Sequence, residues 1–339
     1  MQMSNIKLKS YIVKLYYRYF WHYKEWQKSN AIQYQKVAGF YCSHTQSTLV
    51  PKEEQLVIFM VDGRAYHGGL SDRLKGIVAT YQWCLKHGYN FRICWNYPYK
   101  LDDYLLPNKY NWMIDKSDLI YNEYAKPITL YDHGLGYQKL FFNICLHKEI
   151  DAYHKQYHVY SNMCGYDSYF FSTFHKLFRP VNKLQVTIEE HLNNIGKDYV
   201  SMTFRFQELL GDFREQGQWK HLSKTEADSL INKCISKIEE IYNREVKTGR
   251  VLVTSDSKTF LDEVAKRLNF AYVIPGNLCH MDYNNGITDY DTHMRSFLDM
   301  YMISNAKMVY LLIADNMYHS NFAKRSSLLG RCHYKEIVF

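Results

Sequence analysis

The residues in this sequence that could carry chemistry follow short apolar runs. The first set comes after the run 56–61 and opens a predicted helix: Gly68-Gly69-Leu70-Ser71-Asp72-Arg73. Glycines let a ligand approach the backbone, and the start of a helix attracts anions. The set matches neither the G-x-G-x-x-G pattern nor a Walker A loop. It indicates either a ligand beside the backbone or an ordinary tight turn.

The second candidate is an arginine at the end of a predicted strand, in Thr203-Phe204-Arg205-Phe206. A guanidinium is permanently charged and donates in a bidentate fork, which suits a diphosphate. The alternative is a structural ion pair with Asp212 or Glu208.

Two more polar sets each precede a predicted helix. Thr254-Ser255-Asp256-Ser257 could accept hydrogen bonds from a ribose or a purine edge, or Ser255 or Asp256 could cap the helix that begins near Lys258. Ser320-Asn321-Phe322-Ala323 could seat a phosphate at a helix start, with capping again the alternative.

Several catalytic classes are disfavoured. Asp289-Tyr290-Asp291 looks like a metal-binding D-x-D, but it follows a polar loop, and Asp291 is better interpreted as a helix N-cap, so we expect no metal site. No H-E-x-x-H or G-x-S-x-G occurs, which argues against zincins and α/β-hydrolases. No two cysteines have zinc-finger spacing.

Composition indicates a folded protein with an anionic partner. The 339 residues suffice for two domains, and 47% hydrophobic with 22% charged residues excludes disorder. The net charge is +8, yet no basic run interleaves with an RNP-type motif, so nucleic acid is not expected. The 32 tyrosines suit stacking on sugars, or reflect compositional bias.

Residues 5–28 carry six cations against one acid, Glu25. On a helix, one stripe is apolar and aromatic: Ile12, Leu15, Tyr16, Tyr19 and Tyr23. The pattern predicts contact with an anionic membrane surface, or a helix that packs on its own domain. Because no signal peptide or spanning segment is evident, we expect reduced thiols and a cytoplasmic protein, peripheral at the inner membrane face if this helix binds lipid.

Apolar periodicity predicts an α/β protein. Strand 56–61, helix 70–87 and strand 91–95 form a βαβ unit, and 156–161 could be a strand. A helix near 181–194 leads to strands at 199–206, 250–254, 271–274 and 308–313 that alternate with helices at 224–248, 258–268, 291–305 and 320–329. We therefore expect two Rossmann-like domains facing a cleft: 55–185, then 186–339, after an N-terminal segment and linker, 1–54. Ligands should lie beyond the carboxyl ends of the strands.

The order of these motifs resembles the GDP-fucose fucosyltransferase superfamily over roughly residues 55–330. The likeness rests on the stretches Gly68–Leu74, Arg92–Trp95, Thr203–Arg205, Val253–Ser257, Asp299–Ala306 and Ser320–Ala323. The resemblance implies a GT-B fold, GDP-β-L-fucose as donor, inversion at the anomeric carbon, and neither a metal nor another cofactor.

The resemblance also assigns residues. Arg205 matches the family arginine of the H-x-R motif, which holds the β-phosphate, whereas Thr203 stands where most members carry His. Positions matched to the donor, with their neighbours, are Gly68, Gly69, Asp256, Ser257, Asp299, Ser320, Asn321 and Phe322.

The acceptor hydroxyl must lose a proton to a base. His67 stands nearest the glycines and its ordinary pKa of ~6.5 suits that role, with Asp72 and Asp62 as alternatives. The expected acceptor is a growing surface glycan or lipid-linked oligosaccharide. Two rivals remain: a GT-B transferase with another nucleotide sugar, and a non-catalytic glycan-binding protein of this fold.

Overall fold

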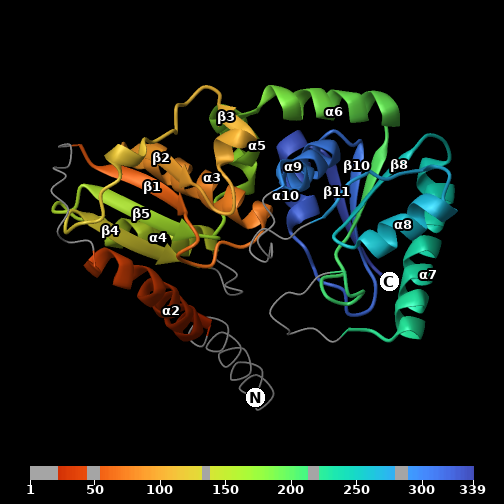
Figure 1. Ribbon diagram of the computed structural model, residues 1–339, viewed down its shortest axis with the longest axis horizontal. Coiled ribbons are helices and arrows are strands. Elements are labelled where there is room, and N and C mark those ends of the chain that lie inside the picture. Colours follow the sequence, from red (N-terminus) through yellow and green to blue (C-terminus); the bar gives the residue numbers. More distant parts are fainter. Residues whose placement is uncertain (1–21, 44–53, 132–137, 213–220, 279–288) are drawn as a thin grey trace, which may run out of the picture. The chain divides into compact units, whose positions relative to one another are not determined.

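The computed structural model describes residues 22–43, 54–131, 138–212, 221–278 and 289–339, and they divide into two compact units (Figure 1). The first unit takes in 22–43, 54–68, 72–97 and most of 107–177. The second takes in 69–71, 98–106 and the described residues from Phe178 onward. The domain limit expected at 185–186 falls inside a helix of the second unit, Asn182–Ile195.

The first unit is built on a four-stranded parallel sheet of order β2-β1-β5-β4. Its strands are β1 (Leu56–Val61), β2 (Asn90–Trp95), β4 (Ala125–Leu130) and β5 (Gln156–Ser161). The sequence predicts all of these except β4, where Lys126 and Pro127 interrupt the apolar run. Lys126 stays out of the core because its Nζ donates to the carbonyl of Glu149 at 2.6 Å.

Three helices follow strands of this unit: α3 (Leu70–His87), α4 (Gln138–Glu149) and α5 (Phe170–Leu177). The predicted bounds of α3 are confirmed. Gly76 lets α3 approach the sheet closely, since a Cβ there would lie 2.4 Å from the carbonyl oxygen of Ser161. The start of α3, which carries Asp72, is therefore held at the carboxyl end of the strands.

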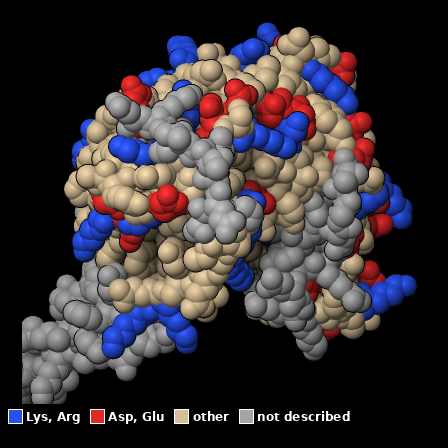
Figure 2. All heavy atoms as spheres, turned by 60° about the vertical axis from the view of Figure 1, so that its left-hand side comes forward, with Lys and Arg blue, Asp and Glu red and all other residues tan. Residues whose placement is uncertain are grey.

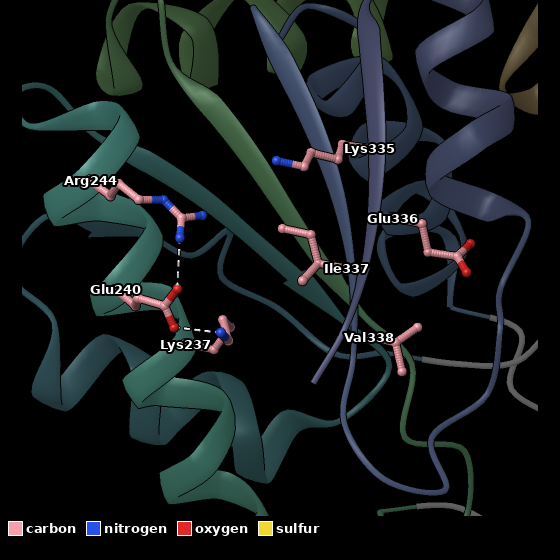
Figure 3. A pocket seen from close by; sticks show the side chains of 7 residues that line it. All are labelled: Lys237, Glu240, Arg244, Lys335, Glu336, Ile337 and Val338. Atoms are coloured by element: carbon pink, nitrogen blue, oxygen red, sulfur yellow. Dashed lines mark hydrogen bonds and ion pairs between the residues drawn. The ribbon is translucent and has the colours of Figure 1, made fainter.

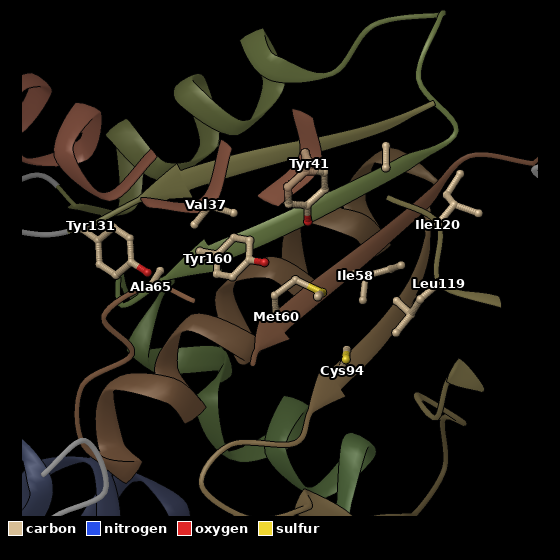
Figure 4. Close-up of a cluster of buried hydrophobic side chains, with 11 residues drawn as sticks. Val37, Tyr41, Ile58, Met60, Ala65, Cys94, Leu119, Ile120, Tyr131 and Tyr160 are labelled. Atoms are coloured by element: carbon tan, nitrogen blue, oxygen red, sulfur yellow. The ribbon is translucent and has the colours of Figure 1, made fainter. Parts of the chain in front are cut away.

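Helix α2 (His22–Ser43) also belongs to the first unit rather than to a separate linker. Its Asn30 amide donates to the carbonyl of Tyr131 at 3.2 Å and accepts from the Tyr131 N–H at 2.7 Å. Val37 and Tyr41 join Ile58 and Met60 in one buried cluster (Figure 4). Most of the predicted membrane helix, residues 5–21, lies outside the described residues.

The second unit has a five-stranded parallel sheet, β11-β10-β7-β8-β9. Its strands are β7 (Val200–Phe204), β8 (Val251–Ser255), β9 (Ala271–Tyr272), β10 (Met308–Ile313) and β11 (His333–Val338). Taken in chain order from the β9 edge, this is 3-2-1-4-5, the order of Rossmann folds. The unpredicted strand is β11, an edge strand whose side chains are mostly exposed and polar.

The helices of the second unit follow the predicted alternation. They are α6 (Asn182–Ile195), α7 (Lys224–Ile241, continued by a π-turn, Tyr242–Val246), α8 (Lys258–Arg267), α9 (Tyr290–Ser304) and α10 (Phe322–Gly330). A short strand β3 (Leu105–Pro107) pairs with β6 (Phe178–Pro180). Helices α9 and α10 approach closely at Gly330, where a Cβ would lie 1.7 Å from the Ser304 carbonyl oxygen.

Candidate functional site

The strand order of the second unit defines a topological switch point between β7 and β10. From β7 the chain proceeds to β8 and β9 on one side, while β10 and β11 lie on the other. Ligands of open α/β sheets bind beyond the carboxyl ends of the strands at such a point. Arg205 follows β7 there, and its carbonyl accepts from the N–H of Tyr318, in the loop after β10, at 3.3 Å.

The Arg205 guanidinium pairs with Asp256, which follows β8. Its Nη1 lies 3.0 Å from Asp256 Oδ2, and the arginine side chain stays 19% exposed. Asp212, considered as its partner from the sequence, caps α8 instead: its Oδ1 accepts from the N–H of Thr259 at 3.0 Å. The guanidinium is therefore ion-paired through one nitrogen, while part of the side chain stays exposed to solvent.

Asp256 organises the turn that follows β7. Its two oxygens accept from the N–H groups of Phe206 at 2.8 Å and Gln207 at 2.7 Å. Gln207 has φ of +53°, which is uncommon for a non-glycine residue. Asp256, predicted to contact the donor, thus acts on this backbone and on Arg205 as a positioning residue.

Two other predicted donor contacts are engaged inside the fold. Thr203 Oγ1 lies 2.9 Å from Thr254 Oγ1, and both threonines are buried. Ser257 is buried; its Oγ caps α8 by accepting from the Phe260 N–H at 3.0 Å and donates to Asp212 Oδ2 at 2.5 Å. The expected cap, Ser255 or Asp256, is wrong by one or two residues. The hydroxyls of Thr203 and Ser257 are thus buried and hydrogen-bonded within the fold.

The start of α10 lies in the loop that touches Arg205. Asn321 is its N-cap but makes no capping hydrogen bond with its side chain. Ser320 Oγ accepts from the N–H of Phe322 at 3.2 Å, and both residues are half-buried. The N–H of Phe322 is therefore engaged by Ser320, while the partial positive charge at the helix start still favours an anion. Ser320, Asn321 and Phe322 therefore lie on the same sheet edge as Arg205.

Asp299 lies on α9 and is buried. Its Oδ1 accepts from Arg295 Nε at 2.8 Å. Burial raises the pKa of Asp299, and the charge of Arg295 opposes that rise. Sequence reasoning missed Arg295; the signal was an Arg and an Asp four residues apart on one helix.

In the first unit, His67 is not placed to act as a base. The ring is buried, and its Nε2 accepts from the Gly63 N–H at 2.9 Å. Burial, and then the charge of Arg73, lower the pKa of His67 to about 3. The expectation of an ordinary histidine pKa is wrong, because the ring is buried beside a positive charge. Its Nε2 lone pair is also engaged, since it accepts from the N–H of its own loop.

Asp62 is also closed off. Its buried carboxylate lies 2.5 Å from Arg64 Nη1 and accepts from the Tyr160 hydroxyl at 2.8 Å. The Arg64 guanidinium in turn stacks on the ring of Phe40 from α2, 3.6 Å from its centroid. This network connects the carboxyl end of β1 to α2 through Asp62, Arg64 and Phe40.

Asp72 is the most open of the three base candidates. Its side chain is 32% exposed, with Oδ1 2.7 Å from the Nζ of buried Lys75. A Cβ at Gly68, whose φ is +73°, would lie 2.7 Å from Asp72 Oδ2, so glycine is required under this carboxylate. Gly68 thus lies against the Asp72 carboxylate, and the half-buried Gly69 follows it in the loop before α3.

The Asp289-Tyr290-Asp291 motif is engaged in helix structure. The N-cap of α9 is Asp289, which accepts from the N–H of Thr292 at 2.8 Å, so the prediction of Asp291 as the N-cap is wrong by two residues. Asp291 instead pairs with Lys183 at 2.7 Å. Within the described ranges, no three His, Cys, Asp or Glu side chains gather as a metal site would need.

A pocket of about 370 Å³ lies elsewhere, between α7 and β11 (Figure 3). Its charges largely satisfy one another: Glu240 pairs with Lys237 and, at 3.0 Å, with Arg244. On the face drawn in Figure 2, acidic and basic side chains are likewise interspersed. Among the helices that are described, none is both long and apolar enough to cross a bilayer.

Comparison with known proteins identifies the fold. No protein-family model and no curated sequence matches the chain. Solved structures do: the NodZ α-1,6-fucosyltransferase soaked with GDP-fucose has a TM-score of 0.53 at 11% identity, covering 81% of this chain and 92% of that one. NodZ from Bradyrhizobium gives the same score and identity, with 82% and 94% covered. FUT1 of Arabidopsis thaliana, as a mutant in complex with GDP, also gives 0.53 and 11%, with 93% and 77% covered.

These likenesses place the chain in the α/β class with the GT-B-type fold seen in GDP-fucose fucosyltransferases. The predicted α/β, GT-B-type fold is confirmed. The two parallel sheets found here are the parts of that fold that the sequence led us to expect.

Proposed function

We propose that the protein is a metal-independent, inverting glycosyltransferase that moves L-fucose from GDP-fucose to a hydroxyl of a glycan. The observation that carries the proposal is Arg205 at the switch point of a Rossmann-type sheet, joined to the loop before α10. The solved structures that share the fold include fucosyltransferases with GDP or GDP-fucose. Their fold is what supports this choice of donor.

The chemistry needs a stabilised leaving group. As the bond between the sugar and the β-phosphate breaks, negative charge grows on the diphosphate. Arg205, the Ser320 hydroxyl and the partial positive charge at the start of α10 would stabilise that charge, and the Asp256 contact would keep Arg205 oriented before the reaction begins. Removing one preorganised donor of this kind costs on the order of 2.7–4 kcal/mol of barrier.

The acceptor hydroxyl attacks the opposite face of the sugar and gives up its proton. We assign the proton to Asp72 rather than His67, because the Asp72 carboxylate is partly exposed and the His67 nitrogen is already hydrogen-bonded. Lys75 would hold the carboxylate in place through its 2.7 Å contact. The acceptor class remains as expected from the sequence, a growing surface glycan or lipid-linked oligosaccharide.

A donor screen tests the proposal. Thermal unfolding is measured with GDP-, UDP- and CMP-sugars, and we expect GDP-selective stabilisation. Release of GDP from GDP-fucose and from GDP-mannose is then measured with and without a chelator. Release of GDP from GDP-fucose should persist when the chelator is present. Stabilisation by UDP-sugars alone would favour the rival transferase. Stabilisation by none of these sugars would favour the glycan-binding rival.

Contact with an anionic membrane surface forms part of the same proposal. Lys24 and Lys28 are exposed on α2, whereas Trp26 on the same helix is buried. Removal of residues 1–21 leaves α2 complete and should abolish co-sedimentation with anionic vesicles. Each lost cation should weaken the free energy of membrane binding by about 1 kcal/mol. Lys24→Gln with Lys28→Gln is the matched smaller change, and neutral vesicles are the control. Equal sedimentation of the truncated and full chains would refute the contact.

A further inference from the structure

Two tyrosines are exposed in contact with each other after β5 of the first unit. The Tyr166 side chain is 49% exposed and that of Tyr169 is 58% exposed. Their ring centroids lie 6.3 Å apart, with an angle of 87° between the ring planes. Single exposed aromatic residues are common on protein surfaces, whereas two in contact form an apolar patch that calls for an explanation. Neither ring belongs to the site already described.

The local backbone holds both rings in place. The Tyr169 N–H donates to the carbonyl of Tyr166 at 3.1 Å, which closes a 3₁₀ turn over Asp167–Tyr169. Helix α5 begins at the next residue, and its Phe170 and Phe174 are buried with their ring centroids 6.1 Å apart. Because this buried anchor follows the turn directly, the tyrosines are fixed without being buried. Groups that are fixed in advance lose little conformational freedom when a ligand binds.

The loop that carries the tyrosines also packs on α3. A Cβ at Gly165, the residue before Tyr166, would lie 2.5 Å from Gln82 Oε1 and 3.3 Å from the Cα of Ala79. The side-chain amide of Gln82 donates to Thr173 Oγ1 on α5 at 3.2 Å. Gln82 therefore contacts the chain both before and after the tyrosine pair.

The loop meets α3 on the helix face that carries Asp72. Ala79 stands seven residues after Asp72, which places it on the same face and about 10 Å further along the helix. Gly165 contacts α3 at Ala79, and Tyr166 follows directly. A chain of sugar rings with one hydroxyl at Asp72 could therefore extend along this face toward the tyrosines.

We propose that Tyr166 and Tyr169 form an outer carbohydrate subsite that binds a neutral pyranose by its C–H face. Tyrosine supplies a rigid apolar ring with a hydroxyl at its edge, which suits a ligand that is apolar on one face and polar around its rim. Two rings at nearly a right angle would contact adjoining faces of that ligand. Ser168, between them in the chain, is exposed and offers a hydroxyl to the sugar. The inference deepens the proposed function and rests on its glycan acceptor.

Glycan binding provides the first test. An array of neutral oligosaccharides built from glucose, galactose, mannose and N-acetylglucosamine is probed with the labelled full chain, and the strongest binder is titrated calorimetrically. Tyr166→Ala and Tyr169→Ala should each weaken its affinity about three- to tenfold, as the loss of a ring contact would. Tyr169→Phe keeps the ring and should stay within about twofold of wild type. Tyr153→Ala is the matched control, because Tyr153 is 57% exposed but lies before β5, stacked on Tyr124.

Sugar transfer provides a second readout. The outer subsite would bind substrate without touching the reacting atoms, so the alanine variants should change KM for an oligosaccharide acceptor rather than kcat. The effect should be smaller for a monosaccharide acceptor, which is too short to reach the pair from Asp72. Because both side chains are exposed, the urea midpoint should stay that of the wild-type protein.

The outcomes separate this inference from the proposed function. Unaltered glycan affinity in folded Tyr166→Ala and Tyr169→Ala proteins would overturn the subsite alone. A changed oligomeric state with retained glycan affinity would assign the pair to a protein contact instead. A chain that releases GDP from GDP-fucose but binds no oligosaccharide of the array would likewise overturn only the subsite. A chain that does neither would overturn this inference and the proposed function together.

Discussion

The carboxyl ends of the two sheets carry similar residues but treat them differently. In the first unit, Asp62 is enclosed by Arg64 and Tyr160, and His67 accepts from its own loop. In the second unit, Arg205 is held on one side and stays 19% exposed, and Arg295 keeps an unused donor. The charged groups of the first edge are enclosed, whereas at the second edge the Arg205 side chain stays partly exposed beside its partner Asp256.

The comparison teaches that residue type does not reveal role. A charge at the end of a parallel strand can stabilise its loop or bind a ligand, and hydrogen-bond partners decide which. Asp72 is the exception in the first unit, because its carboxylate contacts Lys75 and its side chain is still 32% exposed. Variants that separate stability from activity therefore sharpen the contrast.

The largest contrast should come from Arg205→Ala and Asp62→Asn. Loss of Arg205 removes charge stabilisation of the departing diphosphate, so the rate of GDP release from GDP-fucose should fall about 10²–10³-fold. Loss of the Asp62 charge leaves Arg64 without its partner and should cost about 3 kcal/mol of stability, near the lower end for a buried pair. Steady-state kinetics and urea unfolding are measured on both proteins.

Arg205→Lys is the control, since it keeps the charge but loses the bidentate fork and should be impaired to an intermediate extent. The contrast breaks if Arg205→Ala retains wild-type turnover while remaining folded.

Next in size is the pair Asp72→Asn and His67→Gln. If Asp72 takes the acceptor proton, its amide should lower sugar transfer about 10²-fold. Binding of GDP should stay unchanged, since it involves no transfer of a proton to Asp72. His67→Gln retains an acceptor for the Gly63 N–H, so transfer should stay within a few-fold of wild type. Product formation with a glycan acceptor distinguishes them, and the reverse ranking would restore His67 as the base.

The buried histidines of the first unit make its stability depend on pH. The pKa of His67 and that of His158 are each lowered to about 3, chiefly by burial. Between pH 6.5 and 3 the unfolded chain therefore binds protons that the native state does not, and stability falls as pH falls. From pH 7 to 5 each histidine should cost about 2 kcal/mol.

Urea midpoints at the two pH values check this expectation. His67→Gln is the matched control and should remove about half of the pH dependence contributed by the pair. A midpoint that stays constant from pH 7 to 5 would show that these rings are not buried as neutral groups.

Much of the fold could be predicted from the sequence. The strands 56–61, 156–161 and 308–313 match β1, β5 and β10, because each is a short run whose ends are marked by polar or turn residues. β4 and β11 escape prediction since Lys126 and Pro127 in one, and the exposed polar residues of the other, hide the apolar pattern.

The candidate site was less predictable. Arg205 stands out in the sequence as an arginine at the end of a predicted strand, but its ion-pair partner, Asp256, could not be predicted because it follows a different strand. Asp256 and Ser257 look like ligand contacts in the sequence. In the structure, Asp256 accepts from a backbone N–H and Ser257 donates to Asp212, which lies 45 residues away in the sequence. The pKa of His67 depends on burial, which no local pattern reports.

The smallest expected effect concerns the contact between α2 and the end of β4, where Asn30 bonds the backbone of Tyr131. Asn30→Ala removes the amide that accepts from the Tyr131 N–H at 2.7 Å and donates to the Tyr131 and Trp26 carbonyls. A buried N–H left without a partner should reduce the free energy of unfolding by about 1–3 kcal/mol. Gln35→Ala, at an exposed position of the same helix, should change it by less than about 0.5 kcal/mol.

The same variant bears on the contrast between the two edges. Because α2 contributes Phe40 to the Arg64 contact and none of the nucleotide-site residues, Asn30→Ala should weaken the first unit while GDP affinity stays unchanged. Urea unfolding and GDP titration at one temperature measure both. A loss of GDP affinity in a folded Asn30→Ala protein would mean that the two edges are coupled, and that the enclosed network of the first unit serves binding as well as stability.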